Sequence, residues 1–521
     1  MQGTSNKSPR TVVLGVDAMD RRLVERWALD GHLRFLANML ATCPVVTLST
    51  PSRAMQGSVW PSILTGTSPG RHGLYLQTQL ESGTYDLVRR RAIRGPLKKF
   101  YHYLGEAGLR CGVADIPTDA PSPQFPGLQI VDWATEFNFW GFATEPRGLA
   151  REIDSIVGKY PIAHDRKSGD SQSSHMVLGR LLAEGIRRKS ELAQYLLGRS
   201  DLDLVFLVFM EAHKAGHFLW KYFDTEHPDY EISPPELRDG LLTCYQQLDR
   251  ELEVLAGRLG PNDNLLVFSD HGMQAAFRGN HLAEPILETL GLLVREGRRR
   301  ERHDVVTRGS SDDVGTPRSQ WNARLRRFTP GILKPMLRKL LNLPRIDWTR
   351  TQAFVLPTDR NTYIRLNLKG REPEGQVKAG IEYERLLDRI EREFRALMNA
   401  ATGRPAVSDV MRLHALYPGE RAHDLPDIAI LWSAEAPIDA VVSSAVGLIS
   451  GPIRELRSGN HREEGFLLAR GPAFRSGSGR STGDVLQIAP TLLQLHGVEI
   501  PSQFERGPLT SVLERESRRS G

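Results

Sequence analysis

The sequence predicts an α/β fold in which a mostly parallel central sheet is covered by helices on both faces. Two observations support this prediction. Continuous apolar or β-branched runs of five or six residues recur along the chain, which is typical of strands buried on both faces. Helical patterns lie between them, with apolar residues three and four positions apart and charged residues between. Such alternation indicates parallel strands joined by helices.

The expected elements can be placed along the chain from these patterns. The strands are short runs followed by polar residues, at 11–15, 204–209, 264–268, 428–432 and 465–469. The helices are longer and amphipathic, at 21–40, 176–197, 236–258 and 383–398.

One stretch departs from this alternation and carries much of the positive charge. Residues 277–373 include the basic runs 295–302 and 324–339 and lack strands that end in acidic or histidine residues. We therefore expect an inserted cap with a basic, partly disordered loop. The flanking segments 1–276 and 374–521 would form the core of the protein.

The charges of this cap permit two interpretations. The runs 298–302 and 324–327 can bind an anionic polymer or a lipid surface, but they contain few aromatic residues, which favours a solvated insertion. Lys369 and Arg371 can steer an anionic substrate, or they can belong to an ordinary charged turn. The charged turn is the simpler interpretation.

Bulk properties exclude several classes of protein. The chain has 521 residues, of which 40% are hydrophobic and 25% charged, so a fibrous or disordered protein is excluded. The net charge of +6 suits an anionic substrate without requiring nucleic acid. No run is long and apolar enough for a membrane span, and no export signal is visible. Cys43, Cys111 and Cys244 are too widely spaced for a disulfide framework or a zinc finger, so we expect a cytoplasmic protein.

Acidic and histidine side chains follow three of the expected strands. Asp17 follows the first strand, Glu211 the second, and Asp270 and His271 the third. Because ligands bind beyond the carboxyl ends of strands in open α/β sheets, these side chains are expected to converge. Carboxylate and imidazole suit zinc, manganese or a similar ion. The alternative for the turn Asp270-His-Gly272 is a helix cap.

Two more histidine segments extend this candidate site. His213 and His217 are four residues apart and would share one face of a helix that begins near Glu211. A solvated helix start is the alternative for this cluster. His461 lies in a glycine-flanked loop just before a strand, Ser458-Gly-Asn-His-Arg-Glu-Glu-Gly465, and is a weak signal by itself.

Taken together and in this order, the segments resemble the alkaline phosphatase superfamily, and within it the type I phosphodiesterase and nucleotide pyrophosphatase branch. The resemblance covers most of the chain. Besides the histidine segments above, it rests on Gly15-Val-Asp17, Leu64-Thr-Gly-Thr-Ser-Pro-Gly-Arg-His-Gly73, Ser269-Asp-His-Gly272, Asn367-Leu-Lys-Gly-Arg-Glu-Pro373 and Asp484-Val-Leu-Gln-Ile-Ala-Pro-Thr-Leu-Leu-Gln-Leu-His-Gly497.

The resemblance implies a metal-dependent hydrolase of phosphodiesters or phosphomonoesters, acting on a small anionic phosphoester. It implies one divalent ion, zinc or alternatively manganese, held by Asp17, Asp270 and His271. A second would be held by His217, His461 and one further ligand. Two such ions, about 4 Å apart, clamp the attacking and leaving oxygens of a phosphoryl transfer.

The sixth ligand is the first departure from the family pattern. The family places an aspartate four residues before the histidine of this segment, and here that position is His213. Glu211 lies two residues further back. We predict Glu211 as the ligand, because a carboxylate neutralises the charge of the ion and strand ends usually supply ligands. His213 is the alternative.

The nucleophile is the second departure. The family nucleophile, a threonine or serine, lies nine residues before the threonine of Leu64-Thr-Gly66, where this chain has Gln56. A shift of two residues would make Ser58 the nucleophile, at a helix N-terminus that also stabilises phosphate. The alternative for Ser58 is a helix-capping serine.

Three other functions stay open. Ser49-Thr-Pro-Ser-Arg53 has the form that bacterial sulfatases convert to formylglycine, but Ser49 lies sixteen residues before Thr65, about two helical turns too early. A phosphomutase of the same superfamily is another possibility. Because Gln56 replaces the nucleophile, the chain is alternatively a catalytically weakened protein that keeps its metal ligands.

Overall fold

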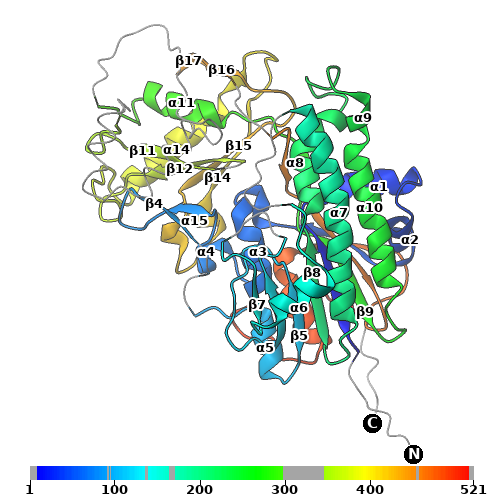
Figure 1. Ribbon diagram of the computed structural model, residues 1–521. Coiled ribbons are helices and arrows are strands. Elements are labelled where there is room, and N and C mark those ends of the chain that lie inside the picture. The colour runs from blue at the N-terminus through cyan, green and yellow to red at the C-terminus, as the bar shows by residue number, and fades with distance from the viewer. Residues whose placement is uncertain are drawn as a thin grey trace, which may run out of the picture.

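The computed structural model describes residues 9–90, 93, 96–134, 139–162, 171–296, 345–358, 360–452 and 457–514. Its main feature is a nine-stranded sheet (Figure 1). In spatial order the strands are β20 (Arg480–Asp484), β2 (Val45–Ser49), β19 (Gly465–Arg470), β9 (Asn264–Ser269), β1 (Thr11–Val16), β8 (Leu204–Phe209), β5 (Cys111–Ala114), β6 (Gly127–Val131) and β7 (Ala143–Glu145).

Most neighbouring strands of this sheet run parallel. The exceptions are β19, which is antiparallel to both of its neighbours, and β7, which is antiparallel to β6. The fully buried central strand β1 pairs in register with β8 and β9 on its two sides, so the carboxyl ends of all three lie together. The predicted mostly parallel α/β sheet is confirmed.

Helices cover both faces of the large sheet. Val12, Leu14 and Val16 of β1 belong to the same buried cluster as α1 (Arg21–Leu29), α2 (Arg34–Thr42), α7 (Gln172–Leu197), α8 (Glu211–Phe223) and α10 (Gly240–Ala256). On the opposite face Val13 packs in a cluster with α3 (Val59–Thr65), α5 (Phe100–Glu106) and α16 (Ile488–Leu495). The long helices α7, α8 and α10 lie side by side (Figure 1).

Two of the expected helices are interrupted. The expected helix 21–40 is α1 followed by α2, because the chain turns at Gly31, whose φ of 78° suits glycine. The backbone N–H groups of Phe35 and Leu36 at the start of α2 donate to the Asp249 carboxylate of α10. The expected helix 236–258 is the short α9 (Pro235–Arg238) followed by α10.

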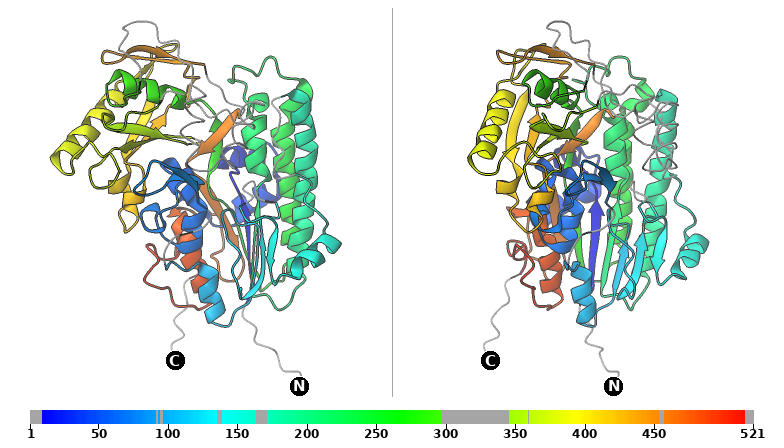
Figure 2. Two further views of the ribbon diagram at one scale, coloured as in Figure 1. Left: turned by 60° about the vertical axis from the view of Figure 1, so that its left-hand side comes forward. Right: turned by 90° about the vertical axis from the view of Figure 1, so that its left-hand side faces the viewer.

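A second unit, which we call the cap, is built around its own antiparallel sheet (Figure 2). Its strands, in spatial order, are β11 (Ala353–Leu356), β12 (Thr362–Leu366), β15 (Ile428–Trp432) and β14 (Val407–Arg412). A smaller sheet is formed by β13 (Met398–Asn399), β16 (Ala440–Ser443) and β17 (Gly447–Ser450). The helices α11 (Ala283–Thr289) and α14 (Ile381–Arg395) share the buried core of this unit.

The cap ends later in the chain than the expected boundary at residue 373. That boundary falls between β12 and α14, and β14 and β15 beyond it complete the same sheet. The run 428–432 is a strand, but it belongs to this second sheet. A continuous apolar run indicates burial on both faces and does not specify which sheet provides it.

A two-stranded ribbon lies where the cap joins the core. The strand β10 (Gly272–Ala275) pairs antiparallel with β18 (Gly459–Arg462), with Met273 opposite His461. Just beyond the ribbon, the Ala276 N–H donates to the Ser458 carbonyl at 2.9 Å. The chain therefore leaves the core and returns to it at one place.

The charged turn at Arg371 belongs to a buried ion network in the cap. Arg371 donates to both carboxylate oxygens of Asp427, at 2.8 and 2.7 Å, and the fully buried Arg365 donates to Glu372 at 2.7 Å. Burial raises the pKa of Asp427, but the Arg371 and Arg365 guanidinium groups outweigh it and lower that pKa to about 2. Arg371 therefore stabilises the cap. This agrees with the interpretation that Arg371 belongs to an ordinary charged turn.

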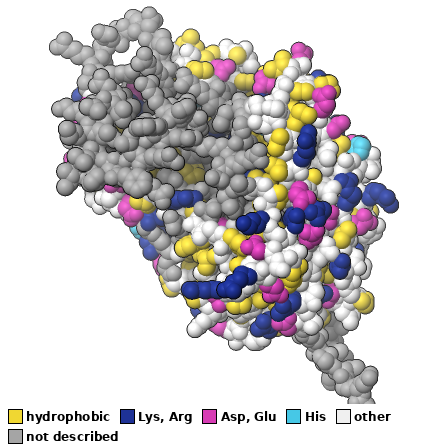
Figure 3. All heavy atoms as spheres, viewed as in Figure 1, with side chains coloured by type: hydrophobic (Ala, Val, Ile, Leu, Met, Phe, Trp, Pro, Cys, Tyr) yellow, Lys and Arg dark blue, Asp and Glu magenta, His cyan; other side chains and the backbone are white. Residues whose placement is uncertain are grey.

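The described surface carries charges of both signs. Lys and Arg side chains alternate with Asp and Glu over the described part of the face in Figure 3. On α7, Arg187 and Arg188 pair with Glu184. The basic runs 298–302 and 324–327 and most of the expected disordered loop lie outside the described residues. Among the helices that the structure describes, none combines the length and apolarity needed to cross a membrane.

Candidate metal centre

The first group of candidate ligands consists of Asp17, Asp270 and His271. Asp17 follows β1, and the other two follow the neighbouring strand β9, so the aligned strand ends bring them together. All three are buried. His271 Nδ1 lies 2.7 Å from Asp270 Oδ2, and His271 Nε2 lies 3.8 Å from Asp17 Oδ1. The sequence predicted this group in full.

Neighbouring residues fix the two carboxylates in place. Trp60 Nε1 of α3 donates to Asp17 Oδ2 at 2.9 Å. The Ala18 N–H donates to Asp270 Oδ1 at 3.3 Å, from a left-handed backbone conformation with a φ of 57°. This conformation costs an alanine about 1 kcal/mol, so the turn after β1 is held by its surroundings.

The charges of this group influence one another. Burial raises the pKa of Asp17, but the adjacent His213 and His271 imidazoles outweigh it and lower that pKa below its ordinary value. Burial and the Asp17 charge together raise the pKa of Asp270. Two carboxylates held this close in a buried site are suited to share a cation.

The second group consists of His213, His217 and His461. His213 and His217 lie one turn apart on α8, and His461 comes from β18. Their Nε2 atoms converge: His213 Nε2 is 2.8 Å from that of His217 and 2.8 Å from that of His461. All three side chains are buried. A trio of imidazole nitrogens in this arrangement is the donor set of a zinc-type site.

The tautomer and charge of these histidines also suit a metal. His217 Nδ1 donates to the Gly459 carbonyl at 2.8 Å, which leaves the Nε2 lone pair facing the group. Burial lowers the pKa of His217 well below its ordinary value, and the Arg457 charge adds to this. Burial and the neighbouring imidazoles also lower the pKa of His461 well below its ordinary value. Neutral imidazole is the form that ligates a metal.

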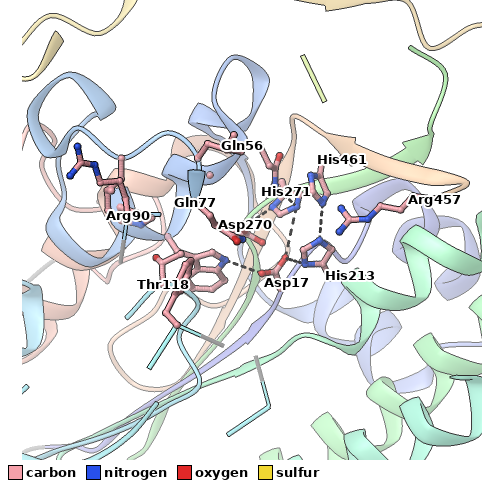
Figure 4. A pocket seen from close by; sticks show the side chains of 16 residues that line it. Asp17, Gln56, Gln77, Arg90, Thr118, His213, Asp270, His271, Arg457 and His461 are labelled. Carbon is pink, nitrogen blue, oxygen red and sulfur yellow. Dashed lines mark hydrogen bonds and ion pairs between the residues drawn. The ribbon is translucent and has the colours of Figure 1, made fainter. Parts of the chain in front are cut away.

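One imidazole joins the two groups. His213 directs Nε2 toward His217 and His461, and its Nδ1 lies 3.2 Å from Asp17 Oδ1. Figure 4 shows this ring between Asp17 and His461. The two candidate metal groups are therefore adjacent and connected through one side chain.

Glu211 does not join either group. Although it begins α8, its Oε1 accepts a hydrogen bond from Tyr160 at 2.8 Å, and its neighbour Lys189 pairs with Asp115. Burial raises the pKa of Glu211 more than the Lys189 charge lowers it. The geometry thus favours His213 and reverses the preference for Glu211. Glu211 lies two residues after the end of β8, and its carboxylate points to a different side of α8 from His213.

Gln56, not Ser58, faces the candidate site. Gln56 Nε2 is 3.0 Å from His271 Nε2, and its Oε1 is buried without a hydrogen-bond partner among the described residues. Ser58 is fully buried and donates to the Met55 carbonyl. The predicted role of Ser58 as nucleophile therefore has no support in the geometry, because Gln56 and Gly57 of the short helical turn Gln56–Ser58 line the pocket and Ser58 does not.

Two other candidate hydroxyls lie elsewhere. Ser49 donates to Asp484 Oδ2 at 2.6 Å at the paired ends of β2 and β20. Ser62 lies 3.0 Å from His72 Nε2, but His72 Nδ1 accepts the Leu74 N–H, so Nε2 carries the proton and donates to Ser62. Burial lowers the pKa of His72 to about 3. This pair is structural, and neither serine has the setting of a nucleophile.

A pocket opens onto the two groups (Figure 4). Its empty volume, including open solvent at its mouth, is about 750 Å³. One wall is apolar and consists of Trp60, Pro61, Leu74, Leu76 and Phe139. Polar residues complete the lining: Gln56, Gln77, Arg90, Thr118 and Arg457.

Arg457, Arg90 and Thr118 were not predicted as site residues. Arg457 lies four residues before His461, and this proximity is the one signal in the sequence. Arg90 and Thr118 come from segments without a motif. Thr118 Oγ1 is buried without a partner among the described residues, and its φ of 62° is rare for a β-branched residue. Figure 4 places Thr118 across the pocket from the histidines.

The position of Ser58 gives a first prediction. Replacing Ser58 by alanine is expected to leave phosphoester hydrolysis within about twofold of the wild type, because the hydroxyl does not face the pocket. The lost hydrogen bond is expected to cost about 1 kcal/mol of stability. Steady-state kinetics and thermal unfolding measure the two effects. A hundredfold loss of turnover with unchanged stability would restore Ser58 as the nucleophile.

The nine-stranded sheet and the paired ligand groups define a protein of the alkaline phosphatase superfamily. A sequence profile described as type I phosphodiesterase / nucleotide pyrophosphatase matches residues 11–382, more than half of the chain. The chain belongs to this family. No match was found among curated proteins.

Two solved structures show a similar fold. Murine ectonucleotide pyrophosphatase / phosphodiesterase 5, as an inactive threonine-to-alanine variant in complex with AMP, has a TM-score of 0.51 and 12% identity. The human protein of the same name has a TM-score of 0.50 and 12% identity. In each comparison the match covers 97% of this chain and 100% of the other.

Proposed function

We propose that this chain is a phosphoester hydrolase that binds two divalent ions. One ion would be held by Asp17, Asp270 and His271, and the other by His213, His217 and His461. The observation that carries the proposal is the adjacency of the two groups, with His213 Nδ1 3.2 Å from Asp17 Oδ1. The membership of the family supports a phosphoester as substrate.

The donor set favours zinc, with manganese as the alternative. Four imidazoles and two carboxylates provide the nitrogen and oxygen ligands that zinc accepts, whereas magnesium and calcium favour oxygen. His217 Nδ1 is bound to the Gly459 carbonyl, and the Nε2 atoms of His217 and His461 each lie 2.8 Å from His213 Nε2, so these Nε2 atoms are the donors that face one another. When bound, such ions stabilise charge on phosphoryl oxygens and make water more acidic.

We further propose that water attacks phosphorus directly. Of the residues that line the described pocket, Thr118 alone carries a hydroxyl, and it lies across the pocket from the histidines. A new bond forms between the water oxygen and phosphorus while the bond to the leaving oxygen breaks. The leaving oxygen takes the electron pair and a proton from solvent, and the attacking water releases one. The Gln56 amide would orient the water or the phosphoryl group.

The pocket walls suggest how the organic part of the ester is held. Trp60, Leu74 and Phe139 provide an apolar surface beside the candidate ligands, and Trp60 also donates to Asp17. An aromatic or apolar substituent on phosphorus would bury its surface there. A phosphomutase is disfavoured, because that reaction requires a side chain that carries the phosphoryl group.

One observation favours a second candidate, a metal-dependent binding protein without turnover. Gln56 occupies the place next to His271 where a hydroxyl nucleophile is expected. In the similar murine structure, a threonine-to-alanine variant is inactive and still holds AMP. By analogy, a chain without this hydroxyl would keep its ligand and lose its chemistry.

Metal analysis combined with three ester substrates tests the proposal. We expect the purified full-length chain to contain two ions and to hydrolyse bis-p-nitrophenyl phosphate or p-nitrophenyl phosphate, but not p-nitrophenyl sulfate. Chelation should abolish turnover, and zinc or manganese should restore it. Two bound ions without turnover of either phosphate ester would overturn the hydrolase and support the binding protein. Turnover of the sulfate ester would support a sulfatase.

A further inference from the structure

A guanidinium group lies beside the second ligand group. Arg457 immediately precedes Ser458 and β18, and its Nη1 is 3.3 Å from His217 Nε2. It lines the pocket, and Figure 4 shows it pointing toward His213 and His461. Arg457 is not a candidate ligand in either metal group, because a guanidinium cannot ligate a metal.

The backbone beside Arg457 is anchored to α8. The Ser458 N–H donates to the His217 carbonyl at 2.8 Å, and the Gly459 carbonyl accepts from His217 Nδ1 at 2.8 Å. The two segments approach so closely that a Cβ on Gly459 would lie 2.0 Å from the Gly216 carbonyl oxygen. The base of the Arg457 side chain is therefore fixed relative to the histidines.

The position of Arg457 beside this group suits an anion. Among the described contacts, the carboxylate nearest these imidazoles is Asp17, whose Oδ1 lies 3.2 Å from His213 Nδ1. A divalent ion on these nitrogens would face the Arg457 guanidinium at short range, and two cations so placed repel each other. An anion between them removes the repulsion and binds both. A phosphoryl oxygen is the anion that this site would receive.

We propose that Arg457 is a specificity-determining residue that binds a non-bridging phosphoryl oxygen at the His213, His217 and His461 group. It would select a terminal, doubly charged phosphate over the singly charged phosphate of a diester. This inference rests on the proposed function. Arginine suits the role, because its planar guanidinium can donate two parallel hydrogen bonds to a phosphate.

A second arginine in the pocket provides a matched control. Arg90 follows β4 (Leu87–Arg89), and its Nη2 donates to Glu81 at 2.6 Å. The Glu81 carboxylate balances its charge, and Figure 4 places it on the other side of the pocket from the histidines. Arg90→Gln therefore removes a pocket arginine without changing the charge beside the second group.

The kinetic test compares a doubly and a singly charged ester. We would measure kcat/KM for p-nitrophenyl phosphate and bis-p-nitrophenyl phosphate at pH 8 and constant ionic strength, for the wild type, Arg457→Gln, Arg457→Lys and Arg90→Gln. Arg457→Gln should lower the monoester to diester ratio by about 10- to 100-fold, the effect of one charged hydrogen bond. Arg457→Lys should recover part of the ratio, and Arg90→Gln should keep it. An unchanged ratio in Arg457→Gln would overturn the proposal.

A binding test does not depend on turnover. Inorganic phosphate and dimethyl phosphate are titrated by calorimetry into the metal-loaded wild type and Arg457→Gln, after metal analysis shows equal metal content. Phosphate affinity should fall at least about tenfold in the variant, and dimethyl phosphate affinity should change little. If no ester is hydrolysed but phosphate binding still depends on Arg457, the hydrolase is refuted and the anion site stands. Equal phosphate affinity in both proteins refutes the anion site.

Discussion

Replacement of His213 by alanine is expected to remove one of two bound metal ions and to lower phosphoester hydrolysis about 1000-fold or more. His213 is the side chain that both groups share, since Nε2 faces His217 and His461 and Nδ1 faces Asp17. Loss of a metal ion removes several kcal/mol of transition-state stabilisation, and each 1.36 kcal/mol is a factor of ten in rate. Metal analysis and steady-state kinetics measure the two effects.

Two further variants make this test specific. His213→Asp restores the carboxylate that the family pattern has at this position, and it is expected to keep two ions and more activity than the alanine variant. His227→Ala, outside both groups, should keep both ions and full activity. If His213→Ala bound two ions while Glu211→Ala lost one, the ligand assignment would return to Glu211.

Replacement of Asp427 by asparagine is expected to destabilise the cap by about 3–5 kcal/mol at pH 7. Asp427 is buried and accepts two hydrogen bonds from Arg371, at 2.8 and 2.7 Å. Removal of the Asp427 charge leaves Arg371 and Arg365 to share Glu372, so one largely buried positive charge loses its compensation, which costs more than the pair itself contributes. Hydrogen exchange of the β12 and β15 amides reports the free energy of opening of this unit.

The same residue predicts a pH dependence with a definite sign. The pKa of Asp427 is about 2 in the folded protein, against an ordinary value of 3.8. Ionised Asp427 therefore contributes about 2 kcal/mol of stability above pH 4, and this contribution is lost as the pH falls through 2. The difference in stability between wild type and Asp427→Asn should shrink over that range.

An exposed ion pair in the same unit is the control for this prediction. Asp388 pairs with Arg412 at 2.5 Å on the surface of α14, where the Asp388 side chain is 61% exposed. Asp388→Asn should change the stability of the cap by less than about 1 kcal/mol. Equal effects of the two substitutions would show that the buried network does not stabilise the cap.

The central strands of the large sheet followed from local patterns, because strands buried on both faces leave continuous apolar runs. The runs that became β1, β8 and β9 were predicted as strands, and their aligned ends brought Asp17, Asp270 and His271 together as expected. The limits of the cap did not follow from such patterns. Strand β15 is a continuous apolar run like β9. Its place in the second sheet is determined by tertiary packing and not by the local pattern.

The other residues of the candidate site could not be assigned from the sequence. Whether each one faces the site depends on the direction of its side chain in the folded structure. Glu211 and His213 lie two residues apart on α8, so their side chains project to different sides of the helix, and only His213 reaches Asp17. Gln56 and Ser58 are also two residues apart, and only the Gln56 side chain reaches His271. Arg457 carried no motif, and the role proposed for it depends on the contact with His217 across the close approach of Gly459 to α8.

The ribbon of β10 and β18 has a consequence for how this chain can diverge. Everything between Ala276 and Ser458 leaves and re-enters the core through neighbouring residues joined by a hydrogen bond at 2.9 Å. Such an arrangement tolerates insertion, deletion or exchange of the intervening segment, since both ends remain paired whatever its length. His271 and His461 lie on the core side of this junction. The intervening segment can therefore diverge in evolution while the candidate metal ligands stay in place.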